Sequence, residues 1–250
     1  MTLALGVIQA RWGSTRLKSK LARQLGGKSL LEWVVRRATA CKRLDQVVVA
    51  IGDGPDGERV AELVPRDVPV IYGSESDVLG RFVQALDTHP TWGVVRICAD
   101  NPFLDPVLID RLVTTAAEHP ECDYLSYGSR TERPMILSSV GLFAEWCRAE
   151  ALRDAARLAY DPADREHVTR YLYGHPERFR VRLLPVPAAL DRDDLRLTVD
   201  VEEDWEHATA ILEALGPEDL EWQRIAQLLD PRPEVRQRMA ALNQAHAKYL

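Results

Sequence analysis

The chain has 250 residues, a hydrophobic content of 46% and a formal net charge of −6 at pH 7. This length and apolar content suit one large domain, expected over residues 1–230, followed by a charged C-terminal helix over residues 231–250. The negative charge argues against a nucleic-acid-binding protein, because that function needs a basic surface. The four scattered cysteines predict reduced thiols in a cytoplasmic protein. The apolar start is too short for a signal peptide or a membrane span, so no membrane association is expected.

Short apolar runs alternate with amphipathic stretches through the first half of the chain. This pattern predicts an α/β protein with a mainly parallel central sheet and flanking helices. Helices are expected from about Leu30, from Asp77 as an N-cap, and after Asp105. The predicted strands are 3–8, 46–51, 68–72 and 93–97.

The alternation weakens between residues 127 and 190, a segment rich in Arg, Tyr, Pro and His. We interpret this segment as an insertion at the edge of the sheet. Its aromatic residues Tyr171, Tyr173 and Phe179 look exposed, which suggests a dimer contact or a contribution to binding an acceptor.

The loop after the first predicted strand, residues 9–20, contains a glycine, hydroxyl groups and four cationic side chains. In an open parallel sheet the ligand binds beyond the carboxyl ends of the strands, and backbone N–H groups and cations there can hold a triphosphate. The alternative is a solvated basic loop. Neither GxxxxGK[ST] nor GxGxxG follows this strand, which argues against a Walker NTPase and a dinucleotide-binding oxidoreductase.

Two aspartates stand at the ends of apolar runs a hundred positions apart. Asp100 follows the predicted strand 93–97, and Asp200 ends the run 196–200, which we also predict to be a strand. Mg²⁺ prefers oxygen ligands and keeps part of its shell for substrate phosphates, so these two carboxylates suffice for a metal site. The alternative for each is a helix cap or turn residue.

Five segments occur in an order that resembles the cytidylyltransferases that make CMP-activated sugars, especially the spore-coat polysaccharide biosynthesis (SpsF-like) branch. The resemblance runs from about Leu3 to Leu215. It implies a nucleotide-diphospho-sugar transferase (Rossmann-like) fold and a homodimer. The segments are 8–17, 73–81, 100–102, 164–169 and 196–200.

The resemblance also implies roles for individual residues. It places catalytic function on Arg11, Lys20, Asp100 and Asp200, of which the two aspartates hold Mg²⁺. Asp77 and Arg81 are also an i,i+4 pair of opposite charge that fits a purely structural role. The nucleotide-binding residues implied are Gln9, Ala10, Arg11, Gly13, Ser14, Arg16, Lys20, Ser74, Asp77 and Arg81.

The sequence departs from the resembling family at two places. Lys18-Ser19 stands where relatives carry Pro-Gly, and residues 136–140 replace an acidic stretch that should approach the acceptor. Acceptor binding is assigned to Ser138 and to the charged motif with Arg165, Glu166 and His167. That motif also fits a helix start with Asp164 as its cap, and for Glu166 we favour this structural role together with a dimer contact.

These features together predict transfer of CMP from CTP to a sugar acid or related acceptor, with release of pyrophosphate, in surface polysaccharide biosynthesis. Two alternatives stay open: a nucleotidyltransferase with another nucleotide or a phosphorylated or non-sugar acceptor, and a catalytically silent nucleotide-binding homologue.

Overall fold

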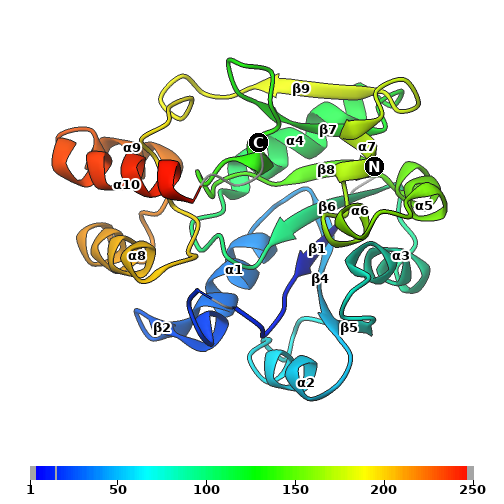
Figure 1. The fold of residues 1–250 in the computed structure, drawn as a ribbon, viewed down its shortest axis with the longest axis horizontal. Coiled ribbons are helices and arrows are strands. Elements are labelled where there is room, and N and C mark those ends of the chain that lie inside the picture. The colour runs from blue at the N-terminus through cyan, green and yellow to red at the C-terminus, as the bar shows by residue number, and fades with distance from the viewer. Residues whose placement is uncertain (1–3, 15, 247–250) are drawn as a thin grey trace.

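The computed structural model describes residues 4–14 and 16–246, and its centre is a seven-stranded sheet in the order β5-β4-β1-β6-β8-β7-β9 (Figure 1). Neighbouring strands are parallel except β8, which runs antiparallel to β6 and β7. The strands of this sheet are β1 (Ala4–Gln9), β4 (Leu44–Gly52), β5 (Val70–Gly73), β6 (Gly93–Cys98), β7 (Tyr124–Gly128), β8 (Glu145–Arg148) and β9 (Val181–Pro185). A separate hairpin pairs β2 (Gln24–Leu25) with β3 (Lys28–Ser29).

Helices cover both faces of the sheet (Figure 1). The apolar side chains of α1, α4, α8, α9 and α10 pack in one core and those of α3, α5 and α7 in the other. Strand residues alternate between the two cores, as the two faces of a pleated sheet require: Ile8 packs in the first and Val7 in the second. The helices are α1 (Leu30–Thr39), α2 (Pro55–Ala61), α3 (Val78–Thr88), α4 (Pro106–Glu118), α5 (Ala149–Leu158), α6 (Pro162–Glu166), α7 (Arg170–Gly174), α8 (Glu202–Leu215), α9 (Trp222–Leu229) and α10 (Pro233–Ala245). Short 3-10 turns lie at η1 (Lys20–Ala22) and η2 (Met135–Leu137).

The predicted α/β class and mainly parallel sheet are confirmed. The expected caps are present too, since the Asp77 carboxylate accepts from the Gly80 N–H at 2.8 Å and Asp105 accepts from the Val107 N–H at 3.0 Å. None of the helices within 4–14 and 16–246 is long and apolar enough to cross a membrane.

The strand predicted at residues 196–200 is wrong: all five residues are described, and none belongs to a strand. Leu197 and Val199 stand at alternate positions, which is why the segment resembles a strand, but all five residues are buried. Three backbone hydrogen bonds hold it in place of a ladder: the N–H groups of Leu197 and Thr198 donate to the Ser139 carbonyl at 2.9 and 3.2 Å, and the Val199 N–H donates to the Asp100 carbonyl at 2.9 Å.

The segment 127–190 lies at the end of the sheet and supplies β8 and β9 to it. Its aromatic residues are not exposed as expected. Tyr171 and Phe179 are buried in the core beneath α3 and α5, and Tyr173 packs against that core. They therefore stabilise the chain's own fold and leave no aromatic surface for a partner at these positions.

Candidate active site

Lys20 joins the two predicted aspartates at the carboxyl edge of the sheet. Its Nζ lies 3.4 Å from Asp100 Oδ2, 3.0 Å from Asp200 Oδ1 and 3.0 Å from the Val199 carbonyl oxygen. Asp100 lies just beyond the end of β6, next to β1, from which the loop with Lys20 starts. Both carboxylates therefore face one cation. Arg16 extends this cluster, with its Nη2 3.5 Å from Asp200 Oδ2.

The hydrogen bond from Val199 to Asp100 explains how carboxylates a hundred positions apart meet, because it fixes the backbone just before Asp200 beside Asp100. The Ser139–Gly141 turn supports the same segment from the other side. Gly141 has a φ of +71°, and a Cβ added there would lie 2.6 Å from the Thr198 nitrogen.

Gly141→Ala is therefore expected to destabilise the protein by about 1–3 kcal/mol, since it combines a left-handed conformation with a backbone clash. Urea unfolding measures this change. Gly174→Ala is the matched control, because nothing lies within 4 Å of its added Cβ. Equal stability losses in the two variants would contradict this account of the turn.

The backbone of the loop before Lys20 bends at Ser19, which has a φ of 51°. This left-handed conformation favours glycine. Ser19 thus adopts the conformation that the glycine of the family's Pro-Gly pair would take readily. Lys20 therefore still reaches the two aspartates. Within the same loop the Ser14 hydroxyl accepts from the Leu17 N–H at 3.4 Å, and Gly13 is exposed. Thr15 lies outside the described residues.

The start of the loop is held by a buried ionic network that sequence reasoning missed. Arg96 donates from Nε to the Gln9 side-chain oxygen at 2.8 Å and from Nη1 to Glu145 Oε2 at 2.7 Å. Thr169 donates to the same carboxylate at 2.8 Å, and the Tyr124 hydroxyl donates to its other oxygen. The signal in the sequence was an arginine in the middle of an otherwise apolar strand, which requires a buried partner.

A second group of predicted residues surrounds the loop after β5. Buried Arg81 donates from Nη1 to the Ser74 carbonyl at 3.0 Å, so it stabilises that loop's backbone. The Asp77 carboxylate caps α3 and pairs with Arg165 Nη2. Burial raises the pKa of Asp77, but hydrogen bonds from Arg165 and the Gly80 amide together lower it below its ordinary value.

The charged motif at 164–167 lies against the first loop. Arg11 Nη1 donates to Glu166 Oε1 at 2.9 Å, an exposed pair that links the predicted nucleotide and acceptor residues. Burial lowers the pKa of His167 below its ordinary value, and the charge of Arg96 lowers it further, which favours the neutral imidazole. The expected helix cap, Asp164, is wrong by three residues. The Asp161 carboxylate caps α6 instead and accepts from the Ala163 N–H at 2.8 Å. The reason is that proline follows Asp161, and proline favours the first position of a helix.

Ser138, the remaining predicted acceptor residue, donates its hydroxyl to the Met135 carbonyl at 2.7 Å within its own turn. Its neighbour Ser139 makes the contacts to the Asp200 segment. The structure therefore brings together the loop, the two aspartates and the 164–167 motif, and it gives Ser138 a local role in the turn.

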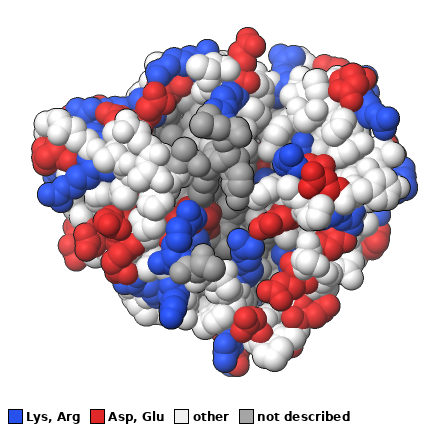
Figure 2. Space-filling view, in the orientation of Figure 1, with Lys and Arg blue, Asp and Glu red and all other residues white. Residues whose placement is uncertain are grey.

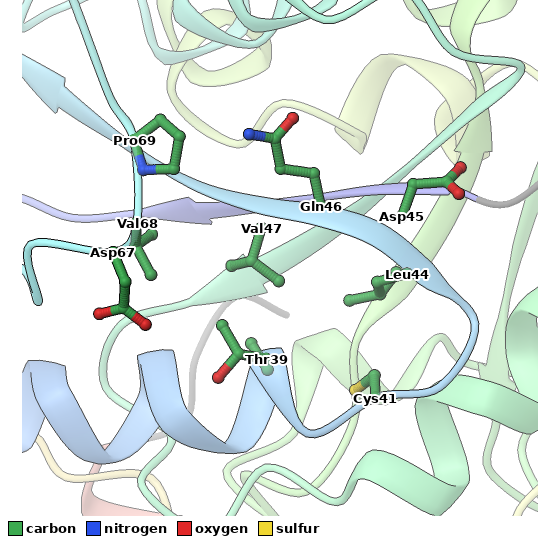
Figure 3. Close-up of a pocket in the computed structure, with 10 residues that line it drawn as sticks. Thr39, Cys41, Leu44, Asp45, Gln46, Val47, Asp67, Val68 and Pro69 are labelled. Atoms are coloured by element: carbon green, nitrogen blue, oxygen red, sulfur yellow. The ribbon is translucent and has the colours of Figure 1, made fainter.

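Basic side chains border a hollow in the face of the molecule shown in Figure 2. A different hollow of about 300 Å³ lies where β4 begins, lined by Thr39, Cys41 and Gln46 among others (Figure 3). This second hollow is at the amino-terminal ends of the parallel strands, away from Asp100. In the described part of the chain no three His, Cys, Asp or Glu side chains gather as a metal site.

A parallel sheet whose carboxyl edge carries a cationic loop and two convergent carboxylates is characteristic of α/β enzymes that act on phosphorylated substrates. The family match specifies the class further: the chain belongs to the cytidylyltransferase family, whose model matches residues 5–244. This match extends past residue 215, where the resemblance in the sequence ended, and includes most of α10.

Individual relatives agree with this assignment. The spore coat polysaccharide biosynthesis protein SpsF of Bacillus subtilis is 32% identical over 92% of this chain and 95% of its own. A cytidylyltransferase from Leptospira borgpetersenii has a similar structure, with a TM-score of 0.83 at 24% identity over 95% of this chain and 97% of its own. A CMP:2-keto-3-deoxy-manno-octonic acid synthetase complexed with CTP gives a TM-score of 0.66 at 17% identity, covering 85% of this chain and 99% of its own. The predicted nucleotide-diphospho-sugar transferase fold and the SpsF-like resemblance are confirmed.

Proposed function

We propose that this protein is a Mg²⁺-dependent cytidylyltransferase that transfers CMP from CTP to a sugar acid or related acceptor. The observation that carries the proposal is the cation site formed by Asp100 and Asp200, where both carboxylates contact the Lys20 ammonium at the end of the loop that also carries Arg11 and Arg16. The family match and the CTP complex of a structural relative support CTP as the nucleotide.

In the proposed reaction an acceptor oxygen attacks the α-phosphorus of CTP and forms the new P–O bond. The bond from the α-phosphorus to the oxygen bridging to the β-phosphate breaks, and pyrophosphate leaves. Asp100 and Asp200 would hold Mg²⁺, which when bound would act as a Lewis acid and neutralise phosphate charge. The carboxylates fit such an ion, because both already face a single cation and both offer oxygen ligands.

The protein's own cationic side chains bind the triphosphate and neutralise its charge. Arg11 and Arg16 bind and orient the triphosphate, and Lys20 neutralises charge that develops on the departing pyrophosphate. Gln9, Ala10, Gly13 and Ser14 supply the surrounding backbone and polar groups of the pocket, and Ser74, Asp77 and Arg81 form its border.

The acceptor binds beside the 164–167 motif in this proposal. Glu166 lies within hydrogen-bonding distance of Arg11, and His167 is biased toward the neutral form that can accept a proton from the acceptor hydroxyl. Arg165, fixed by Asp77, provides the positive charge that an acidic acceptor needs. SpsF, a relative across most of the chain, supports a place in surface polysaccharide biosynthesis.

We also propose a cytoplasmic homodimer in which the segment 127–190 contributes to the contact. In this segment Tyr160 is 88% exposed and Leu158 is 38% exposed, so both side chains are accessible for such a contact. Light scattering measures the molar mass of the parent protein and of Tyr160→Ser in solution. It tests whether the protein is a dimer and whether Tyr160 contributes to the contact.

CTP with Mg²⁺ is expected to raise the melting temperature more than UTP, GTP or ATP, because a ligand that binds only the native state stabilises it by mass action. At a CTP concentration a hundred times its Kd, the stabilisation is about 2.7 kcal/mol. Pyrophosphate release from CTP is then measured with a panel of sugar acids, phosphorylated sugars and other alcohols. A larger shift with another nucleotide would contradict the choice of CTP, and binding without turnover on any acceptor would favour a silent homologue.

A further inference from the structure

A buried ion pair lies directly beside Asp200. Arg196 and Asp204 have side chains that are 0% and 1% exposed. The guanidinium donates to both carboxylate oxygens, from Nε to Oδ1 at 2.6 Å and from Nη2 to Oδ2 at 2.9 Å. This bidentate geometry fixes the orientation of the carboxylate.

The Asp204 carboxylate also holds the backbone that carries Asp200. Its Oδ2 accepts from the N–H groups of Asp200 at 2.9 Å and Val201 at 3.1 Å. Residues 196–200 lie outside the sheet, so no strand ladder fixes them. The ion pair therefore supplies hydrogen bonds at the point where the chain turns from this segment into α8.

The C-terminal helix α10 holds this ion pair in place. Arg196 Nη1 donates to Ser139 Oγ at 3.1 Å and to Asn243 Oδ1 at 3.4 Å. Asn243, on α10, also donates from Nδ2 to the carbonyls of Asp193 at 2.9 Å and Leu195 at 3.0 Å. The Asn243 side chain thus holds the segment that leads to Asp200 through hydrogen bonds.

We propose that Arg196, Asp204 and Asn243 are positioning residues that aim the Asp200 carboxylate at the metal. This inference rests on the proposed function, in which Asp200 is a metal ligand. The physical reason is that a ligand held in its binding orientation before the ion arrives loses less conformational freedom on binding. Groups that orient a metal ligand commonly change metal affinity by about 10–100-fold when they are removed.

The test measures Mn²⁺ binding to the full chain in the presence of CTP, by electron paramagnetic resonance, and so needs no acceptor. Asp204→Asn is expected to weaken Mn²⁺ binding by about 10–100-fold, and Asn243→Ala by about tenfold. CTP binding without metal should stay at the parent value in both variants, because neither residue belongs to the cationic loop.

Two controls separate positioning from general destabilisation. Gln244→Ala changes an exposed amide one residue further along the same helix and should leave Mn²⁺ binding unchanged. Leu152→Ala removes a fully buried side chain of α5 in the other core, whereas the Asp200 segment packs in the first core, so it lowers stability from the opposite face of the sheet. If Leu152→Ala weakened Mn²⁺ binding as much as Asn243→Ala does, the effect would be one of stability and the inference would be wrong.

Asp200→Asn distinguishes failure of this inference from failure of the proposed function. If Asp200→Asn loses Mn²⁺ affinity while Asn243→Ala keeps the parent value, the positioning role is overturned and the metal site stands. If Asp200→Asn itself keeps the parent affinity, both are overturned. Asn243→Ala leaves the buried ion pair in place, so it decides the question even where Asp204→Asn does not fold.

Discussion

Lys20→Met is expected to lower turnover by about 10²–10³-fold while strengthening metal binding in the absence of nucleotide. The loss of turnover follows from the role proposed for Lys20, neutralisation of charge on the departing pyrophosphate, and is comparable with removal of one preorganised donor. The gain in metal binding follows from the structure, since the Lys20 ammonium contacts both Asp100 and Asp200 and so occupies the place that our proposal gives to the metal.

Two measurements check these opposite effects: pyrophosphate release from CTP for turnover, and Mn²⁺ titration of the nucleotide-free protein for metal affinity. Lys18→Met is the matched control, because Lys18 lies in the same loop and is exposed. It should behave like the parent in both assays. Weaker Mn²⁺ binding in Lys20→Met would show that the lysine supports the ion and does not compete with it.

Glu145→Gln is expected to destabilise the protein by about 3–5 kcal/mol, since it leaves the buried charge of Arg96 without a counter-charge. Glu145 is fully buried and accepts from Arg96, Thr169 and Tyr124. In this variant an NH2 group replaces one carboxylate oxygen, so two donor groups would face each other. Guanidinium chloride unfolding measures the loss.

Asp67→Asn is the control, because Asp67 also pairs with an arginine, Arg36, through hydrogen bonds at 2.6 and 3.1 Å, but this pair lies on the surface. Exposed pairs contribute little to stability, so its unfolding midpoint should match the parent. An unfolding midpoint of Glu145→Gln equal to that of the parent would contradict the view that the buried network rigidly supports Gln9. If Glu145→Gln loses stability as expected, its folded molecules should also bind CTP more weakly, since Arg96 orients the Gln9 amide.

The fold was largely predictable from the sequence because its first half follows a regular period. β1, β4 and β6 are rich in apolar residues, and the caps Asp77 and Asp105 mark helix starts. The order of the strands was not predictable, since β8 enters between β6 and β7 with the opposite direction. That placement depends on packing between residues far apart in the chain.

The site was predictable where chemistry and position coincide. Asp100 and Asp200 were identified by their place at the ends of apolar runs and Lys20 by the resemblance, and the structure brings their side chains together. Arg96 and Asp204 were missed because no motif links them to their ion-pair partners, which lie 49 positions away for Arg96 and eight for Asp204. A local pattern records which residues are charged, and only the folded chain shows which charges are buried together.

The contact between Lys20 and Asp200 spans 180 positions of the chain, and the residue that seats Arg196 stands at position 243. Because synthesis proceeds from the amino terminus, the nucleotide loop and Asp100 are complete long before the rest of the cation site exists. A chain that ends before α10 therefore contains the basic loop and both aspartates but lacks Asn243, which holds the segment that leads to Asp200. The geometry of the cation site thus depends on a helix that is synthesised after all of the site's charged residues.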